Sequence, residues 1–434
     1  MPASHRALLL ALALLTLVGA GLLVWWRSAG RSVYFCEAAA HPAAYEGNWF
    51  YQLHAGPDGW LLRDDDLTTR FALEPSTLGY LERLTDALEA RGVTLVVAAQ
   101  PPRGVALPSE SLPGYDPGAA LRRYQEARAA LQKTGLHVTD LAAVVRDTPD
   151  YFFRRDHHWT PAGAEGSARA VARDLQATGN FAGLEPQAFR TERVRREEQV
   201  GSFGEAVGRI CGDNPPAERL TRTRTVAEIA EEPPAEGLFG DAPAPPITLV
   251  GTSNSARKDL NFAGFLEEAT GLAVLNASAV GGGPQAALEA YLRSEAFHES
   301  APAFIVWEFA TLFDLPQDPR FYRQLIPSVR GACSRAAGVG AVRRAVDGGT
   351  LTLFDEMLEG KASFLYLEFS DLSLTAFELE LRYEDGRGER VALRRSSRER
   401  NDGRYFWALA GRPDRVTLTL PEGATGDVQA RLCP

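Results

Sequence analysis

Cysteine is scarce in this chain, and its spacing matches no metal-binding motif. The 434 residues contain four cysteines, at positions 36, 211, 333 and 433, and no Cys-x-x-Cys pair. The histidines do not cluster with these thiols, which argues against a zinc site. An even number of widely spaced cysteines instead indicates disulfide bonds and an oxidising compartment.

An excess of positive charge is also lacking. The formal net charge is −10 at pH 7, which argues against broad binding to nucleic acid or to an anionic membrane, although a local basic groove is compatible with it. No Gly-x-Gly-x-x-Gly motif is present either, since the glycines at 281 to 283 lack that spacing. We therefore expect neither a metal nor an organic cofactor.

Charge is missing altogether from one long segment near the N-terminus. Residues 7–26 carry no charged side chain and are almost wholly apolar, and Arg6 and Arg27 flank them. The run is long enough to span a bilayer and ends in two tryptophans, a residue type that favours the membrane interface. We predict that residues 1–30 form a signal peptide or a membrane anchor and that the protein is exported. Small residues near 18–20 and 28–30 leave the question of cleavage open.

Four cysteines allow three disulfide pairings, and the order of the cysteines does not choose among them. Cys333 and Cys433 bracket the C-terminal region, so a bond between them would close that region into one unit. Cys36 would then pair with Cys211 in the first part of the chain. We favour this arrangement over the two alternatives.

Helical and strand-like segments alternate through the first three quarters of the chain. Apolar residues follow a helical period between 76 and 92, and the apolar run 93–98 comes directly after it. Further helices are expected at 119–134 and after 161, and further buried strands at 137–141, 247–250, 274–278 and 303–309. This alternation predicts an α/β fold with a parallel sheet flanked by helices. Part of the polar segment 181–246 is expected to fold over the sheet as an insertion tethered by Cys211.

Beyond Cys333 the pattern changes to short segments of alternating polar and apolar residues. They lie at 363–369, 376–383, 390–394, 405–409 and 416–420, separated by turn residues. The alternation predicts a β-sandwich of about 95 residues. We therefore predict three parts: the export segment at 1–30, an α/β domain at 31–332 and a β-sandwich at 333–434.

Two of the seven histidines stand together beside an aspartate in the segment 155–163. In an extended segment, residues two apart face the same side, so Asp156 can accept a hydrogen bond from one ring nitrogen of His158. The other nitrogen would then act as a base. Thr160 and Pro161 suit the N-cap and first position of a helix, which would fix the imidazole. On the triplet alone, a capping aspartate beside two surface histidines explains the pattern equally well.

A candidate nucleophile follows the expected strand 247–250. Ser253 comes after a glycine turn and before an expected helix, which places its hydroxyl at the carboxyl end of a parallel strand. Backbone N–H groups and the helix dipole there can stabilise an oxyanion. A serine that merely caps the helix is the alternative. Because the Asp-x-His pair is expected at the same sheet edge, we predict Ser253 as nucleophile, His158 as base and Asp156 as its orienting partner.

Four further residues are candidates for substrate contacts. Asn254 and Gly282 lie near the expected catalytic edge, where glycine permits close approach of an acyl group, although a plain turn explains Gly282 equally well. In the sandwich, Arg404 and Trp407, with the basic residues at 394, 395 and 398, suit an anionic sugar. The alternatives are a sandwich that stabilises the protein or docks a partner, and burial of Trp407 within its strand.

Taken together, these motifs resemble a known family. The likeness rests on Asp-x-His-x-Thr-Pro-Ala-Gly at 156–163, Gly-Thr-Ser-Asn-Ser at 251–255, the Leu-Asn and Gly-Gly-Gly-Pro stretch at 275–284, and the terminal sandwich. The combination is similar to the alginate O-acetyltransferases of the AlgX and AlgJ group, and the sandwich favours the AlgX branch. This resemblance implies an SGNH-hydrolase-like domain followed by a carbohydrate-binding module, and it supports the favoured disulfide pairing.

The motif differs from that of ordinary SGNH hydrolases in two respects. There the Asp-x-x-His pair follows the serine, and the serine lies in Gly-Asp-Ser. Here the pair precedes Ser253, and only one residue separates Asp156 from His158. Thr252 stands where the Gly-Asp-Ser motif has its aspartate, as in the AlgX and AlgJ group.

The resemblance implies acetyl transfer in the periplasm to hydroxyls of an anionic exopolysaccharide such as alginate, as part of polysaccharide biosynthesis and secretion. Acetyl groups would arrive through a membrane-bound O-acyltransferase and secretion proteins of the same complex. We expect no nucleic-acid partner, and membrane association only through the N-terminal segment. Two alternatives stand beside this prediction: a polysaccharide acetyl esterase that uses the same triad, and a non-catalytic assembly protein that binds polysaccharide.

Overall fold

The computed structural model describes most of the chain beyond its N-terminal segment. The described residues are 34–48, 52–67, 71, 73–109, 111–228, 244–334, 337–356, 360–395 and 401–434. The predicted signal peptide or membrane anchor at 1–30 lies outside these ranges, as does Arg398. Within them, no helix combines the length and the apolar character that crossing a bilayer requires.

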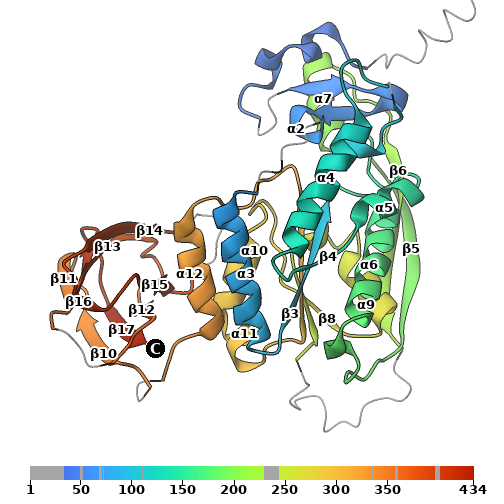
Figure 1. Ribbon diagram of the computed structural model, residues 1–434. Helices are drawn as coiled ribbons and strands as arrows, with labels where there is room; N and C mark the ends of the chain where they lie inside the picture. Colours follow the sequence, from blue (N-terminus) through green and yellow to red (C-terminus); the bar gives the residue numbers. More distant parts are fainter. Residues whose placement is uncertain are drawn as a thin grey trace, which may run out of the picture.

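A five-stranded parallel sheet forms the centre of the first part of the chain (Figure 1). Its strands follow the order β4–β3–β9–β7–β8. Their bounds are β3 Thr94–Gln100, β4 His137–Val138, β7 Ile247–Val250, β8 Val274–Asn276 and β9 Phe304–Ala310. Every residue of β3 and β7 is buried, because helices cover both faces of a parallel sheet. The predicted α/β fold is confirmed.

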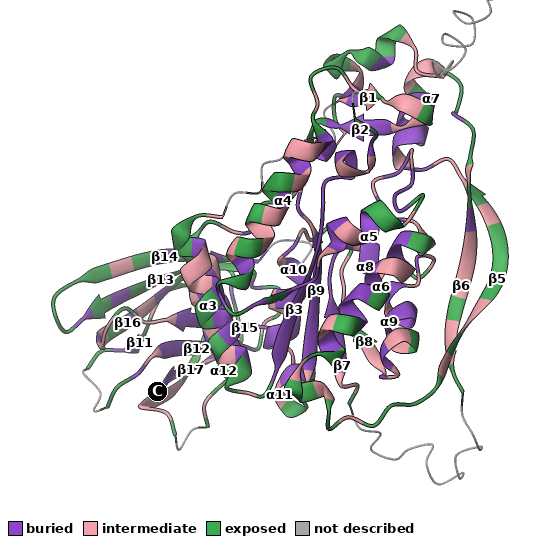
Figure 2. Cartoon of the chain, turned by 45° about the vertical axis from the view of Figure 1, so that its right-hand side comes forward, coloured by how far each residue is buried: buried purple, intermediate pink, exposed green. Residues whose placement is uncertain are grey.

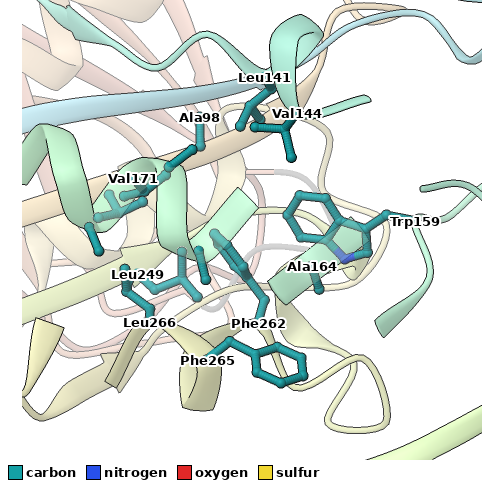
Figure 3. Packing of buried hydrophobic residues seen from close by; sticks show 14 of the residues in the cluster. Ala98, Leu141, Val144, Trp159, Ala164, Val171, Leu249, Phe262, Phe265 and Leu266 are labelled. Carbon is teal, nitrogen blue, oxygen red and sulfur yellow. The ribbon is translucent and has the colours of Figure 1, made fainter. Parts of the chain in front are cut away.

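Two helical layers enclose this sheet (Figures 1 and 2). One layer comprises α3 Pro75–Glu89, α10 Ala286–Arg293, α11 Glu295–Glu299 and α12 Pro319–Arg330, and the other comprises α5 Leu141–Asp147, α6 Pro161–Gln176 and α9 Phe262–Thr270. Helix α4, Pro117–Gln132, lies beside the edge strand β4. Figure 3 shows the core between the sheet and the layer of α5, α6 and α9, where Val171 of α6, Leu249 of β7 and Phe262 of α9 pack near Trp159.

The segment 181–246 contains a long antiparallel hairpin of β5 Phe189–Gln199 and β6 Glu218–Ala227, joined through α7 Ser202–Cys211. The hairpin packs along α9, where Asn261 donates hydrogen bonds to Thr223 and Thr225. The expectation of an insertion over the sheet is therefore wrong in its placement, because the helices already cover that face. The tether is present: α7 ends at Cys211, which is bonded to Cys36.

Short elements from the start of the described chain pack against α7. They are β1 Leu53–Ala55, β2 Leu61–Arg63 and α2 Asp64–Leu67. The 3₁₀ turns of the chain are η1 Glu37–Ala40, η2 Pro42–Tyr45, η3 Pro57–Gly59, η4 Arg103–Ala106 and η5 Gly179–Phe181.

The C-terminal part is a sandwich of two four-stranded antiparallel sheets, ordered β10–β17–β12–β15 and β11–β16–β13–β14. The strands are β10 Gly340–Ala345, β11 Gly349–Phe354, β12 Phe364–Phe369, β13 Ala376–Tyr383, β14 Gly388–Arg394, β15 Arg404–Ala408, β16 Pro413–Leu420 and β17 Asp427–Cys433. Strand β13 alternates strictly between exposed and buried residues, which leaves one face for the shared core. The second disulfide, Cys333–Cys433, ties the last strand to the segment before the first.

Helix α12 joins the two parts of the molecule, since it packs on β15 of the sandwich as well as on α3 (Figure 1). Its Arg323 guanidinium lies 4.2 Å from the ring centroid of Trp407 and pairs with Glu389. From the sandwich, Arg395 reaches Glu289 of α10 at 2.9 Å. These contacts are largely buried, so they hold the sandwich against the helical layer.

Candidate active site

The candidate nucleophile lies where the sheet's carboxyl edge turns into a short helix. Strand β7 ends at Val250, and Thr252 caps α8, Ser253–Ala256, by accepting a hydrogen bond from the Asn254 N–H. The helix is four residues long, shorter than the expected continuous helix, and α9 starts separately at Phe262. A helix this short has little dipole, so stabilisation of an oxyanion would depend mainly on the backbone N–H groups at the start of α8, and it stays a prediction.

Asp156 and His158 form the expected pair. Both the backbone N–H and Nδ1 of His158 lie at hydrogen-bond distance from Asp156 Oδ1, at 3.0 and 2.5 Å. On the other side of the ring, Nε2 lies 2.8 Å from Ser253 Oγ. A carboxylate only accepts, so Nδ1 carries the proton and Nε2 is free to accept the serine proton. The three predicted residues are thus adjacent and in hydrogen-bonding order.

Asp156 is placed to remain ionised. Its Oδ2 accepts a hydrogen bond from the Ser202 N–H at 2.8 Å. Burial raises the pKa of Asp156, but the hydrogen bond from His158, the charges of His158 and His157 and the Ser202 N–H outweigh burial, and the pKa lies well below its usual value. An ionised Asp156 fixes the imidazole tautomer and stabilises an imidazolium that forms during proton transfer.

Asp156 and His158 lie in a tight turn where the backbone reverses direction between residues 151 and 160. Phe152 and Trp159 form an antiparallel bridge, and the Thr160 N–H donates to the Tyr151 carbonyl. Thr160 then caps α6 through a 3.1 Å hydrogen bond from the Gly163 N–H, as the sequence predicts for this position. The reversal is anchored at both ends, which limits movement of the imidazole.

Asn254 connects the nucleophile to this reversal. Its side-chain Oδ1 accepts from the Trp159 backbone N–H at 3.2 Å, and its backbone carbonyl accepts from the Trp159 indole N–H at 3.2 Å. The indole is fully buried and packs 4.7 Å from the Phe262 ring centroid. Asn254 was predicted as a substrate contact; it lines the cleft, but its carboxamide oxygen is engaged in bracing the base-bearing segment.

The second histidine has other partners. His157 Nδ1 lies 3.0 Å from Ser202 Oγ. Burial, followed by the charge of His158, lowers the pKa of His157 to about 3. His157 is therefore neutral near pH 7, while His158 alone faces the serine.

A cleft of about 690 Å³ opens above the serine. One wall is the loop of Gly281, Gly282 and Gly283, and the mouth carries Val280 and Phe313, which are 68% and 38% exposed. Gly282 therefore lies at the predicted site, and its contact with a substrate stays a prediction. The apolar mouth suits a small acyl group better than a charged one.

The Gln100 to Gly104 loop, at the carboxyl end of β3, has a structural role. Arg103 is buried and donates to the carbonyls of Leu61 and Phe153, at 3.0 and 2.6 Å, and to Asp66 at 2.9 Å. Arg103 thereby holds residues 153 and 154, which directly precede the Asp-x-His pair. Both terminal nitrogens of the guanidinium are engaged by these buried partners, so Arg103 does not offer them to a ligand.

Sequence reasoning missed one charged neighbour of the pair. Arg257 Nη1 lies 3.2 Å from His158 Nδ1, and the guanidinium also pairs with Asp259. No pattern in the sequence marks it, because Arg257 and Lys258 are ordinary basic residues in the turn between α8 and α9. Its cation lies on the side of the ring opposite to Ser253.

Asp156, His157 and His158 also offer donor atoms within 4.8 Å of one another, the arrangement that a metal ion would need. His158 Nδ1 carries the proton that it donates to Asp156 Oδ1, so this nitrogen has no lone pair to offer a metal ion. We assign this cluster to proton transfer and not to metal binding.

The two sandwich candidates have different surroundings. Trp407 is 1% exposed and lies in the sandwich core beneath Arg323, so it has no free face for a sugar, and that prediction is wrong. Arg404 pairs with Glu295 at 2.5 Å and lines a separate cavity of about 460 Å³ at the junction, together with Arg330 and Arg431. Of the basic run, Arg395 is buried against Glu289.

Comparison with known proteins adds three findings. Residues 53–311 match the family model described as SGNH hydrolase-like domain, acetyltransferase AlgX. The chain is 32% identical over 423 residues to the alginate biosynthesis protein AlgX of Pseudomonas aeruginosa PAO1, covering 92% of this chain and 88% of the relative. It is 31% identical to the probable alginate O-acetylase AlgJ of Pseudomonas fluorescens over 265 residues, which is 58% of this chain and 66% of that protein.

Solved structures give the same picture. A structure of Pseudomonas aeruginosa AlgX superposes with a TM-score of 0.78 at 30% identity, covering 92% of this chain and 99% of that one. The O-acetyltransferase domain of Pseudomonas putida AlgJ superposes with a TM-score of 0.52 at 27% identity, covering 64% of this chain and 99% of that one.

Proposed function

The chain belongs to the AlgX family of SGNH-hydrolase-like acetyltransferases, and from this premise we propose that it transfers acetyl groups through Ser253 to hydroxyls of an anionic exopolysaccharide, alginate being the first candidate. The observation that carries the proposal is the unbroken chain of hydrogen bonds from Ser253 through His158 to Asp156 at the floor of an open cleft. The named substrate of the relatives, alginate, supports the choice of polymer.

The reaction needs two transfers at one serine. His158 Nε2 takes the Ser253 proton while the hydroxyl attacks the carbonyl of an acetyl donor, and the protonated imidazole then gives the proton to the leaving group. A sugar hydroxyl enters next and attacks the acetyl carbonyl while His158 removes its proton. The bond to Ser253 Oγ then breaks, and the imidazolium returns the proton to that oxygen. Asp156 keeps the imidazole oriented through both steps.

The sandwich is assigned to polymer binding, with the division between the two parts placed at residue 333. The supporting observation is the junction cavity of about 460 Å³, which is lined by Arg404, Arg330 and Arg431 together with three glutamates. Guanidinium groups pair well with carboxylates, the group that a uronate polymer repeats along its length. The acetyl donor would be delivered by a membrane-bound O-acyltransferase complex and its secretion partners in the periplasm, and the two disulfides agree with such an oxidising compartment.

The test uses the chain from about residue 31 onward with p-nitrophenyl acetate and mannuronate oligomers, and mass spectrometry scores acetylated sugar. Wild type should yield acetylated oligomers, whereas Ser253→Ala and His158→Ala should lower the rate by roughly three to six orders of magnitude, since both remove a triad member. Ser300→Ala and His41→Ala, exposed and outside the cleft, serve as matched controls and should retain wild-type rates.

Two other outcomes decide between the remaining functions. Serine-dependent release of acetate without acetylated sugar would assign the chain to the esterases, because water and sugar hydroxyls compete for one acetyl-serine. No activity in wild type or in either variant, with polymer export retained in cells that carry Ser253→Ala, would instead favour a non-catalytic assembly role.

A further inference from the structure

Glu308 is a carboxyl group buried directly beneath the nucleophile. It lies on β9 and has no exposed surface. The preceding residue, Trp307, pairs in parallel register with Val250 at the end of β7, so Glu308 lies beside Gly251, where the chain turns toward Ser253. A carboxyl group at such a place is unfavourable unless hydrogen bonds compensate for the lost water.

The compensation comes from neutral donors on two neighbouring segments. Glu308 accepts from the Gln100 side-chain amide at 2.5 Å on one oxygen. Its other oxygen accepts from the Thr252 backbone N–H at 2.9 Å, the Thr252 hydroxyl at 3.0 Å and the Ser255 hydroxyl at 2.8 Å. Three of the four donor groups therefore belong to the segment that carries the nucleophile.

These donors lie on both sides of Ser253. Thr252 precedes it and Ser255 follows two residues later, so one carboxyl group holds both flanks of the serine. Because the Thr252 hydroxyl donates to Glu308, its lone pairs are available to accept the Asn254 N–H that starts α8. The carboxyl group thus orients the cap of the helix as well as the turn before it.

Gly251 is the residue that allows this close approach. A methyl group at its Cβ position would lie 2.6 Å from Glu308 Oε2 and 2.8 Å from Ser255 Oγ. Burial raises the pKa of Glu308, whereas the hydrogen bonds from Ser255, Thr252 and Gln100 act in the opposite direction. The arrangement directs three donor groups of the nucleophile segment to one buried carboxyl group, and the Thr252 hydroxyl lies within hydrogen-bond distance of both of its oxygens.

We propose that Glu308 is a positioning residue for acyl transfer, which fixes the Thr252 to Ser255 segment so that the Ser253 hydroxyl points at His158 Nε2. Glu308 touches neither substrate nor the reacting atoms; it acts through Thr252 and Ser255. The proposal rests on the proposed function in one respect, since it takes Ser253 to be the group that reacts.

Glu308→Gln tests the proposal, because an amide offers one acceptor oxygen in place of two and carries no charge. Two readouts are measured on the whole exported chain: the rate constant for covalent labelling of Ser253 by phenylmethylsulfonyl fluoride, followed by mass spectrometry, and kcat and KM for p-nitrophenyl acetate. We expect the labelling rate and kcat to fall between about ten- and hundredfold, as expected when a reacting group is misplaced by about 1 Å. KM should stay within about twofold, since the cleft walls are unchanged.

A merely structural role would give a different signature. Partial unfolding lowers the fraction of protein that is labelled, but it leaves the rate constant of the folded fraction unchanged. Glu82→Gln, at an exposed glutamate on α3, is the matched control and should behave as wild type. A folded Glu308→Gln protein that is labelled at the wild-type rate would overturn the proposal.

Ser255→Ala and Thr252→Val provide a second measurement if Glu308→Gln does not fold. Each removes a hydroxyl donor from Glu308 while leaving the carboxyl group in place, and each should slow labelling of Ser253 in a folded protein; unchanged rates in both would overturn the proposal. If wild type is folded and Ser253 is not labelled at all, it is the proposed function that fails, and the two failures are thereby distinguished.

Discussion

At the scale of single residues, the two adjacent histidines illustrate how strongly local contacts decide chemistry. His158 lies between Asp156 and Ser253, whereas His157 faces Ser202. The rings are 3.8 Å apart between centroids, close enough that a charge on one opposes a charge on the other. Keeping His157 neutral therefore makes it easier for His158 to accept a proton during catalysis.

This arrangement predicts how stability depends on pH. The pKa of His157 is lowered to about 3 in the folded protein, and in the unfolded chain it is about 6.5. Between these values the unfolded state binds a proton that the folded state does not, so the free energy of unfolding should fall as pH drops below about 6.5. The contribution of one such group is at most about 1.4 kcal/mol per pH unit. Urea unfolding monitored by tryptophan fluorescence from pH 7.5 to 4.5 measures it.

His157→Gln is the comparison for this prediction. His298, whose pKa is lowered to about 4 by burial and by the charge of Arg91, contributes a similar slope in both proteins and cancels in the difference. The variant should therefore lose less stability than wild type over the same pH range. If the free energy of unfolding changed with pH equally in the variant and in wild type, His157 would not be the source of the pH dependence.

Residue roles were predictable where several residues form one pattern. Asp156 and His158 are two apart and Ser253 follows a glycine turn, so spacing alone suggested all three. Glu308 gave no such signal: it is one acid within an apolar strand, and its donors lie more than 50 positions away in the sequence. Trp407 was misjudged because an aromatic residue in an alternating strand can face either side, and here it faces the core of the sandwich.

At the scale of elements, α6 matters because its first turn fixes the base-bearing reversal. Gly163 lies so close to that reversal that an added Cβ would be 2.3 Å from the Tyr151 carbonyl oxygen. The backbone at Tyr151 also accepts the Thr160 N–H, so neither partner can move without disturbing the other.

Gly163→Ala should therefore destabilise the protein although alanine favours helices. We expect a loss of about 1–3 kcal/mol, the range for overpacking, together with a fall in kcat as the reversal shifts. The matched control is Gly79→Ala in α3, where an added Cβ has no neighbour within 4 Å; it should stabilise the protein by about 0.5–1 kcal/mol. Thermal denaturation of both variants checks the opposite signs, and equal effects would contradict the argument.

Elements with strong periodicity were predictable from the sequence, and those with weak periodicity were not. The run at 247–250 and the alternation at 376–383 match β7 and β13 in bounds. Strand β10 has no buried residue, so it carries no hydrophobic pattern to detect. The helix after Ser253 is divided because Arg257 takes an extended conformation that ends α8, and α9 starts anew after its N-cap Asn261; local sequence does not impose this break.

At the scale of the whole molecule, the junction sets the position of the sandwich relative to the catalytic cleft. Arg323 stacks on Trp407, and Glu289 is shared between Arg293 and Arg395. Removing one member of such a buried group leaves charges without a partner, which costs about 3–5 kcal/mol. The contacts that fix the sandwich could not be predicted from the sequence, because they join residues from distant segments.

The double variant Arg323→Ala, Glu289→Gln should release the sandwich from the helical layer. We expect a larger radius of gyration in small-angle X-ray scattering and loss of transfer to oligomers, with hydrolysis of p-nitrophenyl acetate retained because the triad is untouched. Arg390→Ala, which removes an exposed pair with Glu380 within the sandwich, is the control and should change neither. Unchanged scattering in the double variant would show that other contacts hold the two parts together.

The two disulfides close two covalent rings, and residues 212–332 lie outside both of them. One ring spans Cys36 to Cys211 and carries Asp156 and His158; the other spans Cys333 to Cys433. Ser253 belongs to neither ring, so base and nucleophile are joined by a single backbone path and otherwise only by noncovalent contacts. A single cut between 212 and 246 would therefore yield two separable polypeptides, each holding half of the catalytic machinery, and the active site would become a property of their complex.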